Sequence, residues 1–334
     1  MHVFELTRAL VDIESITGNE KAVAGFLYEH LRPLAARHSG SVEYMEVERD
    51  RLNVFAQWGS PEVVLSTHLD TVPPFIGSRE DPDYIWGRGA CDTKGIIAAM
   101  VAALDGLLEE GVRNVGLLLV VGEERNSAGA RSANRQPRGS RYLINGEPTE
   151  NKLALGSKGA LRLEVEAKGR MAHSAYPELG ESAIRKLLEA LAALDRVEWP
   201  VDAVLGESTC NIGTISGGRA PNVVPDRAHA EIMIRLVNNS GDLRHKVLQA
   251  LGDQVTTRVV LDVPPVHLGA LPGLETTVVK FTTDIPELTN WGQPFLLGPG
   301  SIHVAHTSEE RVAKKELLRA VELYQYMVKE LQNR

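Results

Sequence analysis

The sequence predicts an α/β domain, with a mixed sheet between helices, that carries an inserted α+β module. Short apolar segments alternate with helical ones in the first half of the chain, whereas residues 158–261 show the period-two pattern of a half-buried antiparallel sheet. The tail then returns to helices and a short strand. We therefore expect a first domain from residues 1–156 and 265–334 and a second domain from residues 157–264.

The elements of the first half follow in order. Residues 1–38 have apolar side chains at helical spacing, interrupted at Thr17-Gly18. The segments after them are expected to form strands at 52–56, 63–67, 115–121 and 142–144 and a long helix at 95–108. Alternation of strand and helix predicts parallel neighbours with helices on both faces of the sheet.

The inserted module has a different pattern. Apolar and polar residues alternate at 161–165 and 230–236, and residues 183–194 have helical spacing. This combination predicts a sheet with helical cover on one face.

The tail is expected to hold apolar segments at 276–281 and 295–297 and a final helix. A capping box, Thr307-x-x-Glu310, precedes the apolar stripe of that helix. The sequence therefore predicts that the helix starts at this box.

Composition limits the classes of function. Hydrophobic residues make up 43% of the chain and charged residues 24%, with a net charge of −8, as in a globular protein. Only Cys91 and Cys210 are present, so His, Asp or Glu would have to hold any metal ion. The acidic balance argues against nucleic acid as a partner, and no apolar run approaches the ~20 residues of a membrane-spanning helix. We expect a cytoplasmic enzyme that contacts neither nucleic acid nor membrane.

Five short segments rich in histidine and carboxylates follow expected strands. They are 66–70, 89–95, 122–124, 145–149 and 303–306. Because open α/β sheets bind ligands beyond the carboxyl ends of their strands, the five segments can meet in one crevice. Each segment alone could be a helix cap or a solvated pair, so the prediction depends on the set.

The spacing within the segments suggests how the side chains are used. His68 and Asp70 lie two residues apart at a strand end, so the carboxylate can hold one imidazole nitrogen while the other binds a metal ion. Asp92 lies in a tight glycine-flanked loop that leads into a helix. Glu123 and Glu124 are adjacent and point in different directions, so one can bind a metal ion while the other faces a water molecule.

These motifs occur in the order His68-x-Asp70, Gly-Arg-Gly-x-x-Asp92-x-Lys-Gly, Glu123-Glu124, Gly-Glu147-Pro-Thr and a late His306. In this order they resemble the aminoacylase, carboxypeptidase G and acetylornithine deacetylase family of di-zinc amidohydrolases (peptidase clan MH). The resemblance covers essentially the whole chain. It implies a zinc-peptidase-like catalytic domain, a ferredoxin-like inserted module that serves as lid and dimerisation domain, and a homodimer formed through that module.

The resemblance also implies a role for each residue. One metal ion would be bound by His68 and Glu147 and the other by Glu124 and His306, with Asp92 bridging both. Glu123 would be the general base, and Asp70 would support His68. His303 competes with His306 as the ligand, but the family pattern places the ligand just before a helix cap and so favours His306.

Charge arithmetic fits two metal ions. Two divalent ions bring +4 and Asp92, Glu124 and Glu147 bring −3, so a bridging hydroxide would neutralise the remainder. The pKa of such a water falls from about 15.7 to roughly 7. Glu123 would take the proton, the hydroxide would attack the carbonyl carbon, and Glu123 would return the proton to the leaving amine. Zinc is the expected ion, and cobalt could replace it.

The remaining candidates lie in the inserted module. His173 resembles the family's lid histidine, which donates a hydrogen bond to the carbonyl oxygen as it becomes an oxyanion and can contribute roughly 3 kcal/mol. Residues 217–225, which include Arg219 and Asn222, and the strand residue Arg235 resemble lid segments that bind a substrate carboxylate.

The leading hypothesis is an enzyme that hydrolyses the amide bond of an N-acyl-L-amino acid. The segment Gly146–Thr149 and the short chain look like acetylornithine deacetylases and succinyl-diaminopimelate desuccinylases of arginine and lysine biosynthesis. A metallo-carboxypeptidase or dipeptidase that uses the same site is the alternative. A third hypothesis, a catalytically inactive binding protein, is disfavoured because the base and all five metal-ligand positions are intact.

Overall fold

The computed structural model describes residues 1–334, and the chain divides into two compact units. The first unit comprises Met1–Leu155, Leu268–Thr277 and Thr283–Arg334, and the second comprises Gly156–His267 and Val278–Thr282. The second unit thus includes residues 156, 265–267 and 278–282, which the sequence assigns to the first domain, and the segment 278–282 belongs there because its backbone forms hydrogen bonds in that unit. Lys158 N–H donates to the carbonyl of Val279, and the Ser157 hydroxyl donates to the carbonyl of Phe281.

A six-stranded mixed sheet forms the centre of the first unit, in the order β1-β2-β6-β3-β7-β17. The strands are β1 (Ser41–Glu48), β2 (Arg51–Trp58), β3 (Val63–His68), β6 (Val115–Val120), β7 (Tyr142–Asn145) and β17 (Gln293–Leu296). Strand β3 is parallel to β6 and β7, β17 is parallel to β7, and β1 and β2 are antiparallel. The sequence did not reveal β1, because Met45 is its only buried residue.

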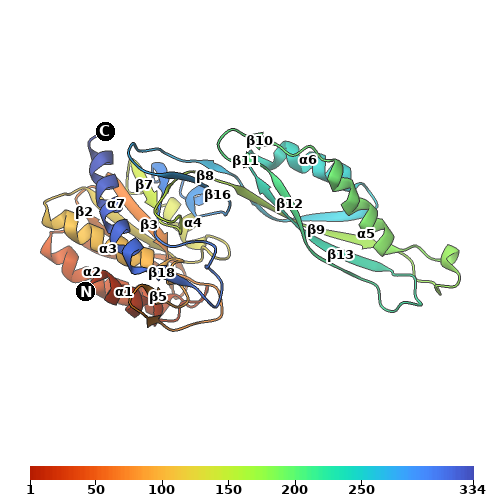
Figure 1. Cartoon of the computed structure of the whole chain (residues 1–334), viewed down its shortest axis with the longest axis horizontal. Helices are drawn as coiled ribbons and strands as arrows, with labels where there is room; N and C mark the ends of the chain where they lie inside the picture. The colour runs from red at the N-terminus through yellow and green to blue at the C-terminus, as the bar shows by residue number, and fades with distance from the viewer. The chain divides into compact units, whose positions relative to one another are not determined.

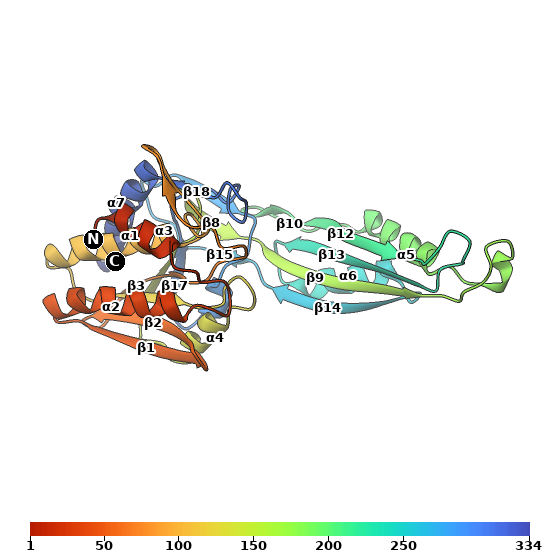
Figure 2. The ribbon, with the colours of Figure 1, turned by 90° about the horizontal axis from the view of Figure 1, so that it is seen from below.

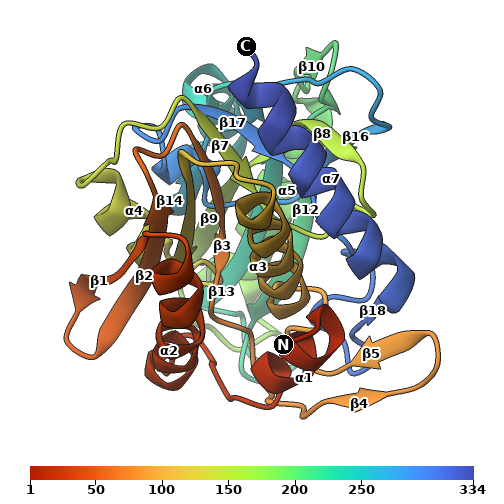
Figure 3. The same ribbon diagram turned by 90° about the vertical axis from the view of Figure 1, so that its left-hand side faces the viewer.

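Helices cover both faces of this sheet, as predicted. On one face lie α1 (Val3–Val11), α2 (Lys21–Arg37), α3 (Lys94–Glu109) and α7 (Lys314–Gln332), and on the other lies α4 (Ala128–Asn134) (Figure 3). Strand β6 packs against both layers: Leu117 and Leu119 join the core under the first, and Leu118 and Val120 the core under α4. Its apolar run is continuous because both of its faces are buried.

The predicted start of the final helix is wrong. Helix α7 begins at Lys314, and its N-cap, Ala313, makes no side-chain cap bond. The residues before it form β18 (Arg311–Ala313), which pairs antiparallel with β5 (Tyr84–Trp86); β5 in turn pairs with β4 (Arg79–Glu80). This long-range pairing overrides the local capping signature and buries Glu310 instead of leaving it at a helix end.

The second unit is a four-stranded antiparallel sheet with two helices on one face (Figure 2). Its elements are β9 (Gly159–Lys168), α5 (Ala183–Ala192), β12 (Thr209–Gly217), β13 (Arg227–Leu236), α6 (Ser240–Leu251) and β14 (Val255–Val263). The spatial order β12-β13-β9-β14 with this connectivity is the predicted ferredoxin-like arrangement. Alternate residues such as Leu163 and Ile232 face the helices, which confirms the period-two interpretation.

The remaining elements are short (Figure 1). They are β8 (Leu153–Ser157), β10 (Val201–Asp202), β11 (Gly206–Glu207), β15 (Val266–His267), β16 (Thr276–Val279), η1 (Pro177–Leu179), η2 (Ala193–Arg196) and η3 (Ile285–Glu287). Strands β15, β8 and β16 form a three-stranded sheet, and β10 pairs with β11. None of the helices combines the length and the apolar character that a membrane span needs.

Candidate metal centre and active site

The first unit brings five predicted site residues to one edge of its sheet. His68 ends β3, Glu124 follows β6 and Glu147 follows β7. These three strands are parallel neighbours, so their carboxyl ends lie together. Asp92 comes from the loop before α3, and His306 comes from the loop after β17.

Asp92 lies between two histidines. Its Oδ1 is 3.0 Å from Nε2 of His68, and its Oδ2 is 3.2 Å from Nε2 of His306. Oε1 of Glu124 is 3.0 Å from the same His306 nitrogen, and Oε2 of Glu147 is 4.0 Å from Nε2 of His68. The contacts thus form two groups that share Asp92, one with His68 and one with His306, and ligand atoms of His68, Asp92 and Glu124 lie within 4.8 Å of one another.

The geometry favours His306 over His303. Both side chains are exposed, but that of His303 forms no hydrogen bond or ion pair, whereas Nε2 of His306 contacts two carboxylates of the cluster. Hydrogen bonds to Asp92 and Glu124 raise the pKa of His306 to about 10. His306 also has a left-handed backbone with φ of 64°, which is uncommon for a residue other than glycine.

The cluster holds several carboxyl groups in a buried place. Burial raises the pKa of Glu123 and of Glu147 well above the usual value, and neighbouring carboxylates raise it further. Burial also acts to raise the pKa of Asp92, but its hydrogen bonds to His306 and His68 outweigh that effect and hold the pKa below its usual range. A group of carboxyls that cannot all ionise is an environment that divalent cations stabilise.

The donor atoms fit a pair of such ions. Nδ1 of His68 lies 2.9 Å from the backbone carbonyl of Asp70, which can only accept, so Nδ1 carries a proton. In the neutral ring Nε2 then presents its lone pair to Asp92 Oδ1, 3.0 Å away. Two acceptors at this distance need a proton or a cation between them. Imidazole nitrogen and carboxylate oxygen are common zinc ligands, so each of the two groups that share Asp92 would hold one ion.

Asp70 supports a larger part of the site than predicted. Its backbone carbonyl, rather than its carboxylate, accepts from His68, whose Nδ1 is 3.6 Å from the nearest Asp70 carboxylate oxygen. The carboxylate accepts from four other donors: the backbone N–H groups of Gly122, Glu123 and Glu124, at 2.9, 3.1 and 3.2 Å, and the hydroxyl of Thr17, at 2.8 Å. Asp70 therefore fixes the segment that carries Glu123 and Glu124.

Glu123 is the uncommitted carboxyl group of the cluster. Its backbone N–H bonds to Asp70, but its side chain forms no hydrogen bond or ion pair. The pKa of this carboxyl is raised by burial, and its side chain is partly exposed, so it can exchange a proton with a water molecule beside the cluster. Its position and environment suit the predicted role of general base.

Two buried acidic residues beside the cluster escaped the sequence analysis. Asp284, just before η3, is 1% exposed, its two carboxylate oxygens have no hydrogen-bond partner, and burial raises its pKa to about 7. Glu310 pairs with Arg88 and binds backbone N–H groups of the Asp92 loop. No local sequence pattern indicates that Asp284 belongs to the site, and the apparent capping box predicts that Glu310 caps a helix.

In the second unit, His173 and Asn222 lie on neighbouring backbone segments. A β-bridge joins His173 to Val223, and the carbonyl of Asn222 accepts from the N–H of Ser174 at 3.0 Å. The imidazole of His173 is exposed, and its Nδ1 accepts from the N–H of Ala175 at 3.1 Å. The opposite nitrogen of His173 makes no hydrogen bond.

The two candidate arginines of the second unit differ. Arg219 donates two hydrogen bonds to Asp226, at 3.1 and 3.0 Å, so its guanidinium fork is already occupied. Arg235 lies on β13, is half-buried and has no carboxylate partner, and burial lowers its pKa. Of these two residues, Arg235 is the one whose full donor capacity is available for a carboxylate of another molecule.

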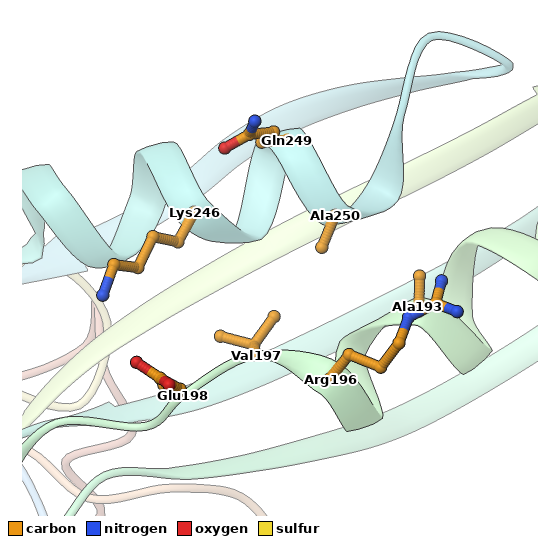
Figure 4. A pocket seen from close by; sticks show the side chains of 7 residues that line it. All are labelled: Ala193, Arg196, Val197, Glu198, Lys246, Gln249 and Ala250. Carbon is orange, nitrogen blue, oxygen red and sulfur yellow. The ribbon is translucent and has the colours of Figure 1, made fainter.

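A groove in the second unit contains none of the predicted residues. It lies between η2 and α6 and is lined by Ala193, Arg196, Val197, Glu198, Lys246, Gln249 and Ala250 (Figure 4). Val197 and Ala250 lie in its middle, and Arg196 and Lys246 lie towards opposite ends. The groove is therefore separate from the substrate residues that the sequence predicts.

A second group of possible metal ligands lies between α2 and α3. His38, Asp105 and Glu109 have ligand atoms within 4.8 Å of one another. The guanidinium of Arg37 lies 3.4 Å from Asp105 and 3.3 Å from Glu109 and supplies a positive charge to both carboxylates. This group therefore has a cation already, unlike the cluster around Asp92.

The fold and the site together define a metal-dependent hydrolase, and comparisons with known proteins agree. Residues 155–260 match the family model described as the peptidase dimerisation domain. The chain is 39% identical to a peptidase M20 domain-containing protein of Schizosaccharomyces pombe, over 98% of this chain and 84% of that protein. It is 38% identical to a probable carboxypeptidase of Aspergillus fumigatus, over 96% of this chain and 84% of the relative.

Among solved structures, a tripeptidase from Staphylococcus aureus has the same fold, with a TM-score of 0.83 at 20% identity over 100% of this chain and 98% of that one. The chain belongs to the M20 peptidase family. The expected family is confirmed at this level.

Proposed function

We propose that this protein hydrolyses the amide bond of a small substrate that carries a free carboxylate, with short peptides as the favoured class. The observation that carries the proposal is Asp92 shared between two groups of ligands, with the uncommitted carboxyl of Glu123 beside them. The names of the relatives, a probable carboxypeptidase and a tripeptidase, support a peptide substrate.

The metal ions, when bound, would polarise the scissile carbonyl and lower the pKa of the attacking water. Glu123 would accept the proton of that water at its carboxylate and later deliver it to the nitrogen of the leaving amine. The bonds between Asp70 and the backbone N–H groups at 122–124 keep the Glu123 backbone fixed during both transfers. Zinc suits the ligand types, and cobalt could take its place.

The second unit would supply substrate contacts. Arg235 would bind the substrate carboxylate through its unpaired fork, and His173 would donate a hydrogen bond to the carbonyl oxygen as negative charge develops there. The match to a peptidase dimerisation domain supports a homodimer formed through this unit.

An N-acyl-amino-acid deacylase is the second candidate function. Its support is the segment Gly146–Thr149, which resembles the acetylornithine deacetylase and succinyl-diaminopimelate desuccinylase type. Both candidates cleave the same type of bond beside the same carboxylate. They differ in whether the acyl part carries a free amine.

Matched substrates can separate the two functions. Metal-stripped protein, with and without added zinc or cobalt, would be assayed on glycyl-ornithine against N-acetyl-ornithine, and on glycyl-lysine against N-acetyl-lysine. The members of each pair differ only by the terminal amine. N-acetyl-citrulline and N-succinyl-diaminopimelate extend the acyl series.

Metal-restored cleavage of the glycyl compounds, at least tenfold faster than the acetyl compounds, is the result we expect. The reverse preference would replace the peptidase assignment with the deacylase. Cleavage that does not depend on added metal would contradict the proposed chemistry for both.

A further inference from the structure

Glu310 is a fully buried carboxylate to which the proposed chemistry gives no role. The residue is 1% exposed and lies immediately before β18. One of its oxygens, Oε2, is 2.5 Å from Nη1 of Arg88. The other, Oε1, accepts from the backbone N–H of Gly89 at 2.8 Å and from that of Asp92 at 3.3 Å. A buried carboxylate with this many donors is held in one position.

These bonds connect two segments that are far apart in the sequence. The pairing of β18 with β5 brings residue 310 beside the chain that leaves β5, where the N–H of Gly87 donates to the backbone carbonyl of Glu310 at 3.0 Å. Arg88 also donates to the carbonyl of Thr307 at 3.3 Å. Arg88 and Glu310 therefore join the loop that carries Asp92 to the loop that carries His306.

Asp92 lies between the two histidines and is in contact with that connection. Its two oxygens lie 3.0 Å from His68 and 3.2 Å from His306, so a small displacement of its backbone would move both contacts. His68 is fixed by the central sheet as the last residue of β3, whereas Asp92 and His306 both lie in loops. The carboxylate of Glu310 contacts the backbone of Asp92 directly, four residues after His306 in the chain.

We propose that Glu310 is a positioning residue that holds the carboxylate of Asp92 in register with His306 and so sets the affinity with which the site would bind its pair of metal ions. This inference rests on the proposed function, because it concerns the same metal site. Groups that orient metal ligands typically change metal affinity about 10–100-fold when they are replaced.

The test compares Glu310→Gln with Glu309→Gln, its exposed neighbour in the chain. The substitution Glu310→Gln keeps the volume of the side chain but removes the negative charge that pairs with Arg88. Affinity for zinc is measured by competition with a chelator of known affinity, and the environment of bound cobalt by its visible absorption spectrum. Thermal unfolding of the metal-free proteins shows whether each variant folds at the assay temperature.

We expect Glu310→Gln to weaken zinc binding about 10–100-fold and to alter the cobalt spectrum, while Glu309→Gln changes neither. If Glu310→Gln does not fold, Arg88→Met combined with Glu310→Gln removes both buried charges and takes its place. A variant that is less stable without metal but binds zinc as tightly as the wild type, with an unchanged cobalt spectrum, would show a merely structural role and overturn the inference. Wild-type protein that binds no metal pair would instead overturn the proposed function, and the inference with it.

Discussion

The two units differ in how far their candidate residues contact one another. In the first unit, Asp92 contacts His68 and His306 at hydrogen-bond distance, and the surrounding carboxylates are mostly buried. In the second unit, His173 is exposed and Arg235 is half-buried without a carboxylate partner. The first set is organised around a shared centre, whereas the side chains of His173 and Arg235 in the second set share no partner.

This difference follows from the chemistry of each set. Metal ligands must converge on one point, so the fold of a single chain has to bring them together before anything binds. Groups that bind a substrate or stabilise developing charge need partners that the chain itself does not supply. Changes in the first unit should therefore affect the chemical step or the metal content, whereas changes in the second should affect binding and turnover of the substrate without changing the metal content.

The largest effect is expected at Glu123. Glu123→Gln removes the group that would transfer the proton, so kcat should fall about 100- to 10,000-fold while bound metal stays unchanged. Steady-state kinetics and elemental analysis of the same preparation measure both. Full activity with normal metal content would assign the base to another residue.

The next effect is expected in the second unit, at His173. Loss of one hydrogen-bond donor to the oxyanion should lower kcat about 100- to 1000-fold in His173→Ala, without a change in metal content or in the unfolding temperature. His245→Ala, an exposed histidine of α6, serves as the matched control. Equal kinetics for the two variants would show that His173 takes no part in the reaction.

A smaller effect should distinguish the two arginines. Arg235→Met should raise KM about 10–100-fold, because a charge-assisted bond to the substrate carboxylate is lost. Arg219→Met should leave KM within about twofold, because the Arg219 fork bonds to Asp226 rather than to a ligand. A larger effect at Arg219 than at Arg235 would reverse our assignment of the carboxylate anchor.

The smallest effect concerns the framework of the first unit at Lys94, whose Nζ is buried and donates to the carbonyl of Ile13 at 2.6 Å. Burial lowers its pKa to about 8, whereas the unfolded chain keeps the ordinary value of about 10.4. Between these two values the unfolded state binds more protons, so this group makes the free energy of unfolding rise with pH, by at most about 1.4 kcal/mol per unit.

Denaturant titrations from pH 7 to 10.5 test whether the free energy of unfolding rises with pH. The rise attributable to residue 94 should be absent in Lys94→Met and present in Lys21→Met, which alters an exposed lysine. Parallel pH profiles for the wild type and Lys94→Met would show that the buried amine does not titrate in this range.

Much of the site could be predicted because the motifs stand at strand ends. His68, Glu124 and Glu147 follow three neighbouring parallel strands, so the apolar runs that predict the strands also place the ligands on one edge. The inserted unit could be predicted because its strands alternate between residues on the buried face of the sheet and residues on the other face. Patterns of this kind record burial, which local sequence expresses directly.

The sequence could not reveal contacts that depend on distant pairing. Thr307-x-x-Glu310 has the local form of a capping box, but the pairing of β18 with β5 turns Glu310 towards Arg88 and the Asp92 loop. The carboxylate of Asp70 was expected to hold His68, yet it binds three backbone N–H groups after β6. A pattern of side chains shows neither which distant strands pair nor which backbone N–H groups a buried carboxylate binds, so neither arrangement could be predicted.

The most direct test of the central claim is the metal content of the protein after stripping and reloading with zinc, measured for the wild type and for Asp92→Asn. We predict about two zinc ions per wild-type chain and a loss of tight binding in Asp92→Asn, because Asp92 is the residue that both groups of ligands share. Wild-type protein that takes up no zinc, or an Asp92→Asn variant that binds two ions as tightly as the wild type, would contradict a metal centre at this edge of the sheet.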